Sequence, residues 1–521
     1  MNRLRKVIAG SLSHVLSSRT ITFTTLIIGC VLILFSNYLY LKRIASFRFV
    51  DEYTNMAVGY LMQSGRVLYQ QIFFHHHPLP VIISSFLQQV VPIHSLYELV
   101  KLHRYLSLGF SFVFALFLLF RFRMKAVVLI TFYEVLKYYI FGYQYLGETF
   151  IAYPIAYMTL LFFETESKKG KVRLWEMVFS GVLTWWIIFQ REPYALLATF
   201  LFICIIRRSN SRKDAIVGIV VSAILSVITL ASLSFTEYFR QIFVLNSTYA
   251  AAEVGGSLQP FVQGVTYLFG YIVTGIRTHH ILYLSLGLLS LGAFGIVAFL
   301  VRNKKQILLG GTIILLILAG IRNPELGSLW YNMYRSIPHI IVLLCIVSFF
   351  SPRTMRLVFV CMLGAGMLLL PTSHFKEHRD NANEFYINYS ETDGISQVIT
   401  AVCEGTPCKL HVDGEDSLVY WQTKLDPWFQ YSVFYNVQES HLDYAEKRRT
   451  QFELSPPDVF YRTECKVRPE FMLTVRKDKR FVPLMKDGSP SCIWITKDLA
   501  SKINTSQKEA IAKHGYFLQG K

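Results

Sequence analysis

The chain has 521 residues, of which 53% are hydrophobic, and its formal net charge at neutral pH is +18. Apolar runs of membrane-spanning length recur from Ile21 to Leu370, so we predict a polytopic α-helical membrane protein. The basic excess does not indicate a nucleic-acid partner, because the Lys and Arg clusters lie in short loops between apolar runs, as is typical of cytoplasmic loops. These clusters are Arg121–Lys125, Lys168–Arg173, Arg207–Lys213, Arg302–Lys305, and Arg353 with Arg356.

The alternation of basic loops with polar or aromatic loops predicts about eleven membrane-spanning helices. The N-terminus is expected in the cytoplasm, and an odd number of crossings places the C-terminus on the extracytoplasmic side of the cell membrane. Phe261–Thr274 is expected to be a re-entrant or interfacial helix that does not cross. The predicted spans are Thr20–Leu41, Leu99–Phe120, Ala126–Phe141, a helix ending near Phe163, Leu174–Phe189, Pro193–Ile206, Ala215–Phe235, Ile281–Val301, Ile307–Ile321, Ile337–Phe350 and Leu357–Leu370.

Three parts are predicted along the chain. Residues 1–371 form the transmembrane domain, whose first outer loop, 42–98, is too long for a simple connector. This loop carries helical patterns at Tyr53–Gln63 and Val81–Val91, the second of them amphipathic and expected at the membrane interface. Residues 372–394 form a linker, and 395–521 form a small extracytoplasmic α/β domain.

The C-terminal domain is predicted from short β-rich runs separated by turn signals. The runs are Lys409–Val412, Phe471–Val475 and Cys492–Thr496. Four of the eight cysteines lie in this polar region, and an extracytoplasmic location allows two disulfides there. Among three pairings, we favour Cys403–Cys408 with Cys465–Cys492.

Two ionisable residues lie inside the third predicted span. Glu134 and Lys137 are spaced i,i+3, share a helix face and can neutralise each other. The pair is interpreted as structural, although ionisable residues in a span are also candidates for function.

The first outer loop carries the main catalytic candidates, Asp51 and Glu52, directly beyond the first span. Transfer of a sugar to a hydroxyl or amine needs a carboxylate that accepts or orients the acceptor proton. A lipid-linked donor stays in the bilayer, so this carboxylate has to stand at the membrane face. The alternative interpretation is that Asp51 or a neighbour caps the helix Tyr53–Gln63.

The neighbouring residues resemble the GT-C superfamily of polyprenyl-phosphate-sugar-dependent glycosyltransferases, and most closely its protein mannosyltransferase and aminoarabinose transferase group. The resemblance extends into the C-terminal region. It rests on Asp51-Glu52, Ala57–Gln63, Ser64-Gly65, Tyr69 with Phe73-Phe74, His77-Pro78-Leu79-Pro80, Val412-Asp413-Gly414, Asp426-Pro427 and Pro456-Pro457-Asp458.

The resemblance implies a GT-C fold and an inverting transferase in which Asp51 is the catalytic carboxylate. Glu148 matches a second acidic position of the family; its alternative role is that of an interfacial residue at a helix start. Arg191 is a candidate for the donor phosphate, because Arg gives forked contacts to phosphate oxygens, unless it pairs with Glu192. Arg335 resembles a family position near the lipid phosphate, and its alternative role is an interfacial anchor.

The histidines His75, His76 and His77 depart from the family, whose members often place a Lys before the prolines. His77 and His75 are candidate phosphate contacts, but His is only partly charged near neutral pH. Two other interpretations remain open: a divalent metal site, since imidazoles bind transition metals, and polar residues of a loop without a ligand.

We therefore predict a membrane glycosyltransferase that moves a sugar from a polyprenyl-phosphate donor to a lipid, polysaccharide or protein acceptor. The alternatives are a transporter or flippase of lipid-linked glycans, and a non-catalytic scaffold. The sequence has no Walker loop, no GxGxxG after a strand, no HExxH and no GxSxG arrangement. The sugar and the acceptor are not determined by the sequence.

Overall fold

The computed structural model describes residues 18–45, 47–247, 259–326, 330–369, 384–433, 438, 441–463 and 470–518. The chain forms two compact units. The first, which we name the helical unit, comprises Met1–Ile44, Arg104–Val227 and Ser257–Arg379. The second, the sheet unit, comprises Ala45–His103, Ile228–Gly256 and Asp380–Lys521.

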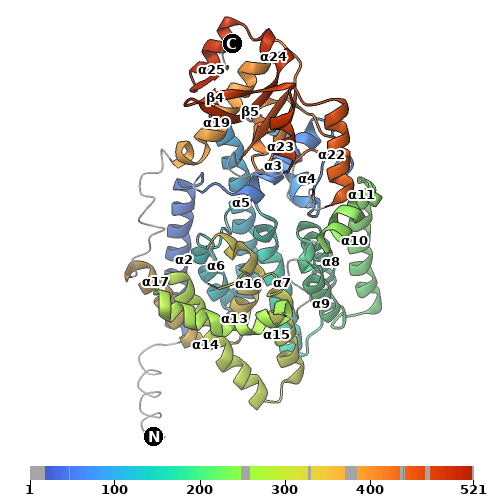
Figure 1. The fold of residues 1–521 in the computed structure, drawn as a ribbon. Helices are drawn as coiled ribbons and strands as arrows, with labels where there is room; N and C mark the ends of the chain where they lie inside the picture. The colour runs from blue at the N-terminus through green and yellow to red at the C-terminus, as the bar shows by residue number, and fades with distance from the viewer. Residues whose placement is uncertain are drawn as a thin grey trace. The chain divides into compact units, whose positions relative to one another are not determined.

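The helical unit is built around three helices that are buried along most of their length: α6 (Val127–Leu136), α7 (Gly147–Lys168) and α16 (Ile337–Phe350). Helix α7 packs against α16, and α16 also packs against α6 (Figure 1). The remaining long helices of this unit are α2 (Ser18–Lys42), α5 (Leu96–Phe122, which begins in the sheet unit), α8 (Leu174–Gln190), α9 (Ala195–Ile206), α10 (Arg212–Ala231), α13 (Gln259–Thr278), α14 (Ile281–Arg302), α15 (Gln306–Ala319) and α17 (Arg353–Leu369).

Within the described ranges, five helices are long and apolar enough to cross a membrane, which suggests an integral membrane protein. They are Arg19–Lys42, Leu96–Lys125, Arg212–Ala231, Ile281–Arg302 and Asn332–Phe350. The total of eleven crossings therefore stays a prediction.

Two predicted segments differ in length from the observed helices. The third predicted span, Ala126–Phe141, is helical only from Val127 to Leu136 and rises about 15 Å, half the thickness of a bilayer core. The chain then turns, and Phe141 has a positive φ of 55°. Instead of the shorter helix Phe261–Thr274, the structure has one continuous helix, α13, of 20 residues that packs along α14.

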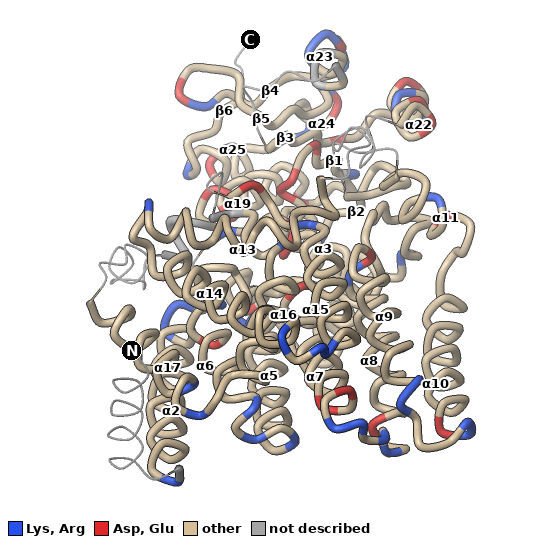
Figure 2. The backbone as a smooth tube through the Cα atoms, turned by 90° about the horizontal axis from the view of Figure 1, so that it is seen from below, with Lys and Arg blue, Asp and Glu red and all other residues tan. Residues whose placement is uncertain are grey.

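The basic loops gather at one end of the helical unit, as the blue segments at the ends of α5, α7 and α8 show (Figure 2). Arg121 forms ion pairs with Glu164 of α7 and Glu176 of α8. Arg208, beyond α9, pairs with Glu166 of α7. Each of α7, α8 and α9 is a single helix with one end at these basic loops. The other ends, which are the start of α7, the end of α8 and the start of α9, therefore lie together at the opposite end of the bundle.

The sheet unit contains a six-stranded mixed sheet with the strand order β2-β1-β3-β5-β4-β6. Strand β1 is parallel to β2 and β3, and the remaining pairs are antiparallel. The strands are β1 (Lys409–Asp413), β2 (Asp426–Pro427), β3 (Val459–Arg462), β4 (Phe481–Lys486), β5 (Ser489–Thr496) and β6 (Tyr516–Leu518). The C-terminal helices are α19 (Glu384–Cys403), α20 (Leu418–Thr423), α22 (Leu442–Leu454), α23 (Glu470–Lys477), α24 (Lys497–Lys502) and α25 (Thr505–Ala512).

Two of the three predicted strands are confirmed, at Lys409–Val412 and Cys492–Thr496. The third is wrong, because Phe471–Val475 lies in helix α23. Phe471 and Val475 are four residues apart, so a helix buries both on one face, and both are buried in an aromatic cluster.

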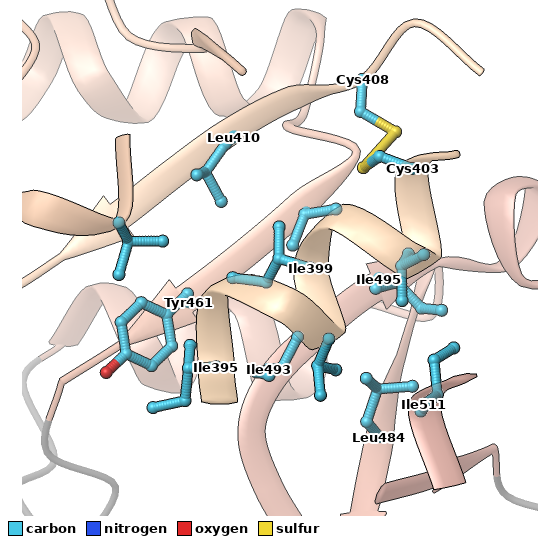
Figure 3. Close-up of a cluster of buried hydrophobic side chains, with 14 of the residues drawn as sticks. Ile395, Ile399, Cys403, Cys408, Leu410, Tyr461, Leu484, Ile493, Ile495 and Ile511 are labelled. Atoms are coloured by element: carbon cyan, nitrogen blue, oxygen red, sulfur yellow. A yellow bond between two sulfur atoms is a disulfide. The ribbon is translucent and has the colours of Figure 1, made fainter. Parts of the chain in front are cut away.

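Helix α19 covers one face of this sheet with Ile395, Ile399 and neighbouring apolar side chains (Figure 3). It begins at Glu384, inside the stretch predicted as a linker. The predicted Cys403–Cys408 disulfide is confirmed, with 5.8 Å between the Cα atoms. The other predicted bridge involves Cys465, which lies outside the described residues.

The predicted first outer loop belongs to the sheet unit from Ala45 onward. It contains helices α3 (Val50–Gln63) and α4 (Leu79–Val90), which pack against each other. Ile72 pairs with Ser432 as an isolated β-bridge, and the Phe73 N–H donates to the Ser432 carbonyl at 3.0 Å. The loop and the C-terminal region therefore share one core.

Candidate functional site

Asp51 and Glu52 lie in the first turn of α3. The helix begins at Val50, and Phe49 is its N-cap residue in extended conformation, with no side-chain cap hydrogen bond. Asp51 is therefore the second residue of the helix, where a carboxylate is stabilised by the positive end of the helix dipole. Glu52 is fully buried, whereas Asp51 is partly exposed. Of the two carboxylates, Asp51 is the one that a ligand can reach.

An ion pair ties the start of α3 to the C-terminal region of the sheet unit. The Arg48 guanidinium lies 3.0 Å from the buried Asp416 carboxylate. Thr392 and Tyr461 donate further hydrogen bonds to the same carboxylate at 3.0 to 3.2 Å. Burial raises the pKa of Asp416, and Arg48 and the two hydroxyls offset part of that rise. Arg48 is three residues before Asp51, so this contact fixes the approach of the chain to the candidate carboxylate.

The three histidines follow the β-bridge and are held through their backbone. The Asn246 amide donates to the His75 carbonyl at 2.7 Å, and the Tyr69 hydroxyl donates to the His76 carbonyl at 2.7 Å. The rings of His75 and His76 are 4.0 Å apart between centroids. The ring of His77 is buried and meets the edge of Tyr238. The segment is thus an ordered part of the sheet unit and not a free loop.

In the helical unit, Glu148 joins two arginines from distant parts of the chain. Glu148 lies in the first turn of α7 and is 1% exposed. Its Oε1 atom accepts from Arg191 Nε at 2.7 Å and from Arg322 Nη1 at 3.0 Å. We name these three residues the Glu148 cluster. Two guanidinium groups and one carboxylate leave a net charge of +1 in a largely buried place, which favours an anionic ligand.

Arg335 is linked to the same end of the helical unit through its backbone. The Tyr194 hydroxyl, just beyond Arg191, donates to the Arg335 carbonyl at 2.8 Å. The Arg335 guanidinium lies over the ring of Tyr334, and its Nε is 3.2 Å from the Tyr334 hydroxyl. Arg191 and Arg335 are therefore held on neighbouring segments of the helical unit.

Several buried polar atoms in and beside the Glu148 cluster have no hydrogen-bond partner among the residues that the structure describes. They are Glu148 Oε2 and both amide atoms of Gln144, Gln190 and Asn323. Gln190 directly precedes Arg191, and Asn323 directly follows Arg322. The Gln190 backbone lies against Gly147, where an added Cβ would come within 2.8 Å of the Gln190 carbonyl oxygen. Buried polar groups are normally paired, so these atoms leave hydrogen-bonding capacity that a polar ligand or water could use.

The Glu134–Lys137 pair predicted in the third span is confirmed, with 2.6 Å between Lys137 Nζ and Glu134 Oε2. Tyr153 of α7 donates to Glu134 Oε1 at 2.6 Å, and Asn37 of α2 donates to Oε2 at 3.2 Å. The pair thus joins α6 to α2 and α7. It supports the turn that leads from α6 to Glu148, which agrees with the structural interpretation.

The predicted site residues fall into two groups. Glu148, Arg191 and Arg335 belong to the helical unit, and Asp51, Glu52, His75 and His77 belong to the sheet unit. The predicted approach of Asp51 to the arginines joins residues of two units and stays a prediction. The sequence interpretation missed Arg322, whose only signal was its place at the start of a predicted outer loop, and it missed Gln241 and Asn246, which hold the histidine segment.

Within the described ranges, no group of three or more His, Cys, Asp or Glu side chains is arranged to hold a metal ion. His75, His76 and His77 are among the described residues, so these three consecutive histidines do not form a metal-binding group in this structure.

Comparison with known proteins gives no family for this chain. No family model matches it, and neither a curated protein nor a solved structure is significantly similar to it.

Proposed function

We propose that this protein is a membrane glycosyltransferase that uses a polyprenyl-phosphate sugar. The observation that carries the proposal is the Glu148 cluster, in which two arginines share one buried carboxylate at the end of a bundle opposite its basic loops. If the basic loops are cytoplasmic, as the positive-inside rule predicts, the cluster faces the extracytoplasmic side, where such donors are used.

In the proposed reaction, the Asp51 carboxylate accepts the proton of the acceptor hydroxyl or amine as that group attacks the anomeric carbon. The bond from this carbon to the phosphate oxygen breaks, and its electron pair stays on the phosphate. Attack from the opposite face inverts the anomeric configuration. The products are the glycosylated acceptor and polyprenyl phosphate.

The arginines would stabilise the phosphate as its negative charge grows. Glu148 neutralises one of the two guanidinium charges of its cluster and holds both groups in place, so the cluster offers one net positive charge, and Arg335 supplies another. The unpartnered amides of Gln190 and Asn323 support the same proposal, because they can both donate to and accept from sugar hydroxyls.

The test is Asp51→Asn in purified protein reconstituted with a polyprenyl-phosphate sugar and a mixture of acceptors. Release of polyprenyl phosphate is measured, because this product forms whatever the acceptor is. We expect release to fall by about 100-fold or more, in line with the loss of a general base. The matched control is Asp498→Asn, which removes an exposed first-turn carboxylate of α24 and should leave release unchanged.

Two results would contradict the proposal. Wild-type protein that moves the lipid-linked sugar across the bilayer without releasing polyprenyl phosphate would instead be a transporter or flippase. Release that is the same in wild type and Asp51→Asn would show that Asp51 is not the catalytic carboxylate.

A further inference from the structure

The short helical segment that is hydrogen-bonded to the backbone of the histidine segment, His75–His77, carries an exposed apolar face. Helix α11 (Phe235–Phe239) continues into a π-helical stretch, η3 (Arg240–Leu245). Phe235, Phe239 and Phe243 recur every four residues and are 59%, 49% and 47% exposed. Their rings form a continuous row, with centroids 6.4 Å and 5.2 Å apart. We name these three side chains the phenylalanine row.

The opposite face of the same helix is buried and fixes its position. Gln241 donates to the Tyr69 carbonyl at 2.7 Å and accepts from the Phe74 N–H at 3.0 Å. Asn246 donates to the His75 carbonyl at 2.7 Å. The helix therefore cannot rotate to bury the phenylalanine row without breaking these hydrogen bonds.

Chain continuity indicates what covers the row. Helix α10 is a candidate membrane span of which only 11% is buried within the protein, so most of its apolar surface needs lipid around it. It ends at Ala231, and α11 begins at Phe235. The three residues between them span at most about 11 Å. The phenylalanine row therefore begins at most about 11 Å from the end of α10. This places the row in the interfacial zone of the membrane, where aromatic side chains concentrate.

Electrostatic attraction contributes little to this surface. Arg240, the basic residue of the helix, pairs with Asp443 and lies 4.0 Å from Glu237. Contact with a bilayer would depend on buried apolar area and not on anionic headgroups.

We propose that the phenylalanine row is inserted into the boundary between headgroups and acyl chains of the bilayer, and that it anchors the histidine segment at the membrane surface. The occupant of this surface is the lipid bilayer itself. The proposal concerns where this part of the chain lies and does not depend on the glycosyltransferase activity.

The test uses the full chain in phosphatidylcholine nanodiscs. Spin labels are attached to cysteines introduced one at a time, by Phe239→Cys or Phe243→Cys. The background replaces the four free cysteines of the described residues, Cys30, Cys204, Cys345 and Cys361, by serine or alanine. Accessibility to oxygen, which concentrates in lipid, is compared with accessibility to a water-soluble nickel chelate. The matched control is Phe517→Cys, an exposed aromatic position in β6.

We expect a several-fold higher ratio of oxygen to nickel accessibility at positions 239 and 243 than at 517, with no change when salt is raised. A ratio equal to that at 517 would overturn the proposal, because the row would then face water. Labels shielded from both reagents would also overturn it, because the surface would then be covered by protein. A second measurement guards against perturbation by the label: benzoylphenylalanine at position 239 should form photo-adducts with phosphatidylcholine, and at position 517 it should not.

Discussion

Replacing Glu148 with alanine should destabilise the helical unit strongly. The carboxylate is 1% exposed and is the shared partner of Arg191 and Arg322. Its removal leaves two guanidinium groups close together, one of them almost fully buried, without the charge that held them. This is a different situation from the loss of a surface ion pair, in which water replaces the partner.

The expected magnitude follows from the two distances. At an effective dielectric constant of about 20, charges separated by 2.7 Å and 3.0 Å attract each other by about 6 kcal/mol per pair before desolvation is subtracted. Desolvation offsets most of this attraction in the wild type. Removal of one partner from a buried pair typically lowers the free energy of unfolding by about 3–5 kcal/mol, which for a unit of this size corresponds to a decrease in Tm of about 6–20 °C.

The assay is thermal unfolding in nanodiscs, followed by tryptophan fluorescence. Trp186 of α8 donates to the Phe150 carbonyl of α7 at 2.9 Å, so it reports on the packing of the two helices next to Glu148. The control is Lys168→Ala, which removes an exposed partner of Glu164 at the other end of α7 and should cost at most about 1 kcal/mol. Arg322→Ala and the Glu148→Ala/Arg322→Ala double variant complete a double-mutant cycle.

The double variant should be more stable than the sum of the single effects predicts, because removal of Arg322 takes away one of the two charges that Glu148→Ala leaves unpaired. Glu148→Ala with the same Tm as Lys168→Ala would refute the argument, since the cluster would then not be held by this carboxylate. Strict additivity of Glu148→Ala and Arg322→Ala would refute the coupling.

Three further predictions concern the sheet unit. Arg48→Ala should lower its free energy of unfolding by about 3 kcal/mol, because the buried Asp416 loses its cationic partner; chemical denaturation monitored by hydrogen exchange in α3 tests this, and unchanged protection would contradict it. The pKa of Asp416 is raised, so this carboxyl contributes stability that is fully present below its unfolded pKa and is lost as the pH rises through the folded value. Stability relative to Asp416→Asn should therefore fall as the pH rises above the unfolded pKa of about 4, and a flat or rising difference would contradict the assignment. Cys403→Ser should cost about 2 kcal/mol, the loop entropy of so short a closed loop, with Cys408→Ser giving the same loss in the same denaturation assay.

Local patterns were sufficient where neighbouring residues decide the outcome. The helix predicted at Tyr53–Gln63 is present as α3, which begins three residues earlier and so includes Asp51 and Glu52. The i,i+3 pair of Glu134 and Lys137 forms as expected. The same kind of reasoning failed at Phe471–Val475, because a short run with two buried positions four residues apart fits either a strand or a helix.

Contacts between distant segments were beyond the reach of these patterns. Nothing near Arg322 in the sequence indicates that it shares a carboxylate with Arg191, because Glu148 is 174 residues away. Likewise, the bond from Asn246 to the backbone of His75 joins segments 171 residues apart. Such pairings depend on how the helices pack, which a periodicity does not specify.

The sequence by itself determined that the chain contains helices long and apolar enough to span a membrane, where its basic loops lie and that a small α/β region follows, because hydrophobicity and charge along the chain report directly on which segments avoid water. Only the tertiary structure decided that the loop predicted at 42–98 shares a core with the C-terminal region, and that Glu148 is placed between Arg191 and Arg322. The physical reason is that a buried charge is stable only beside the partner that packing brings to it, and packing is a property of the whole fold.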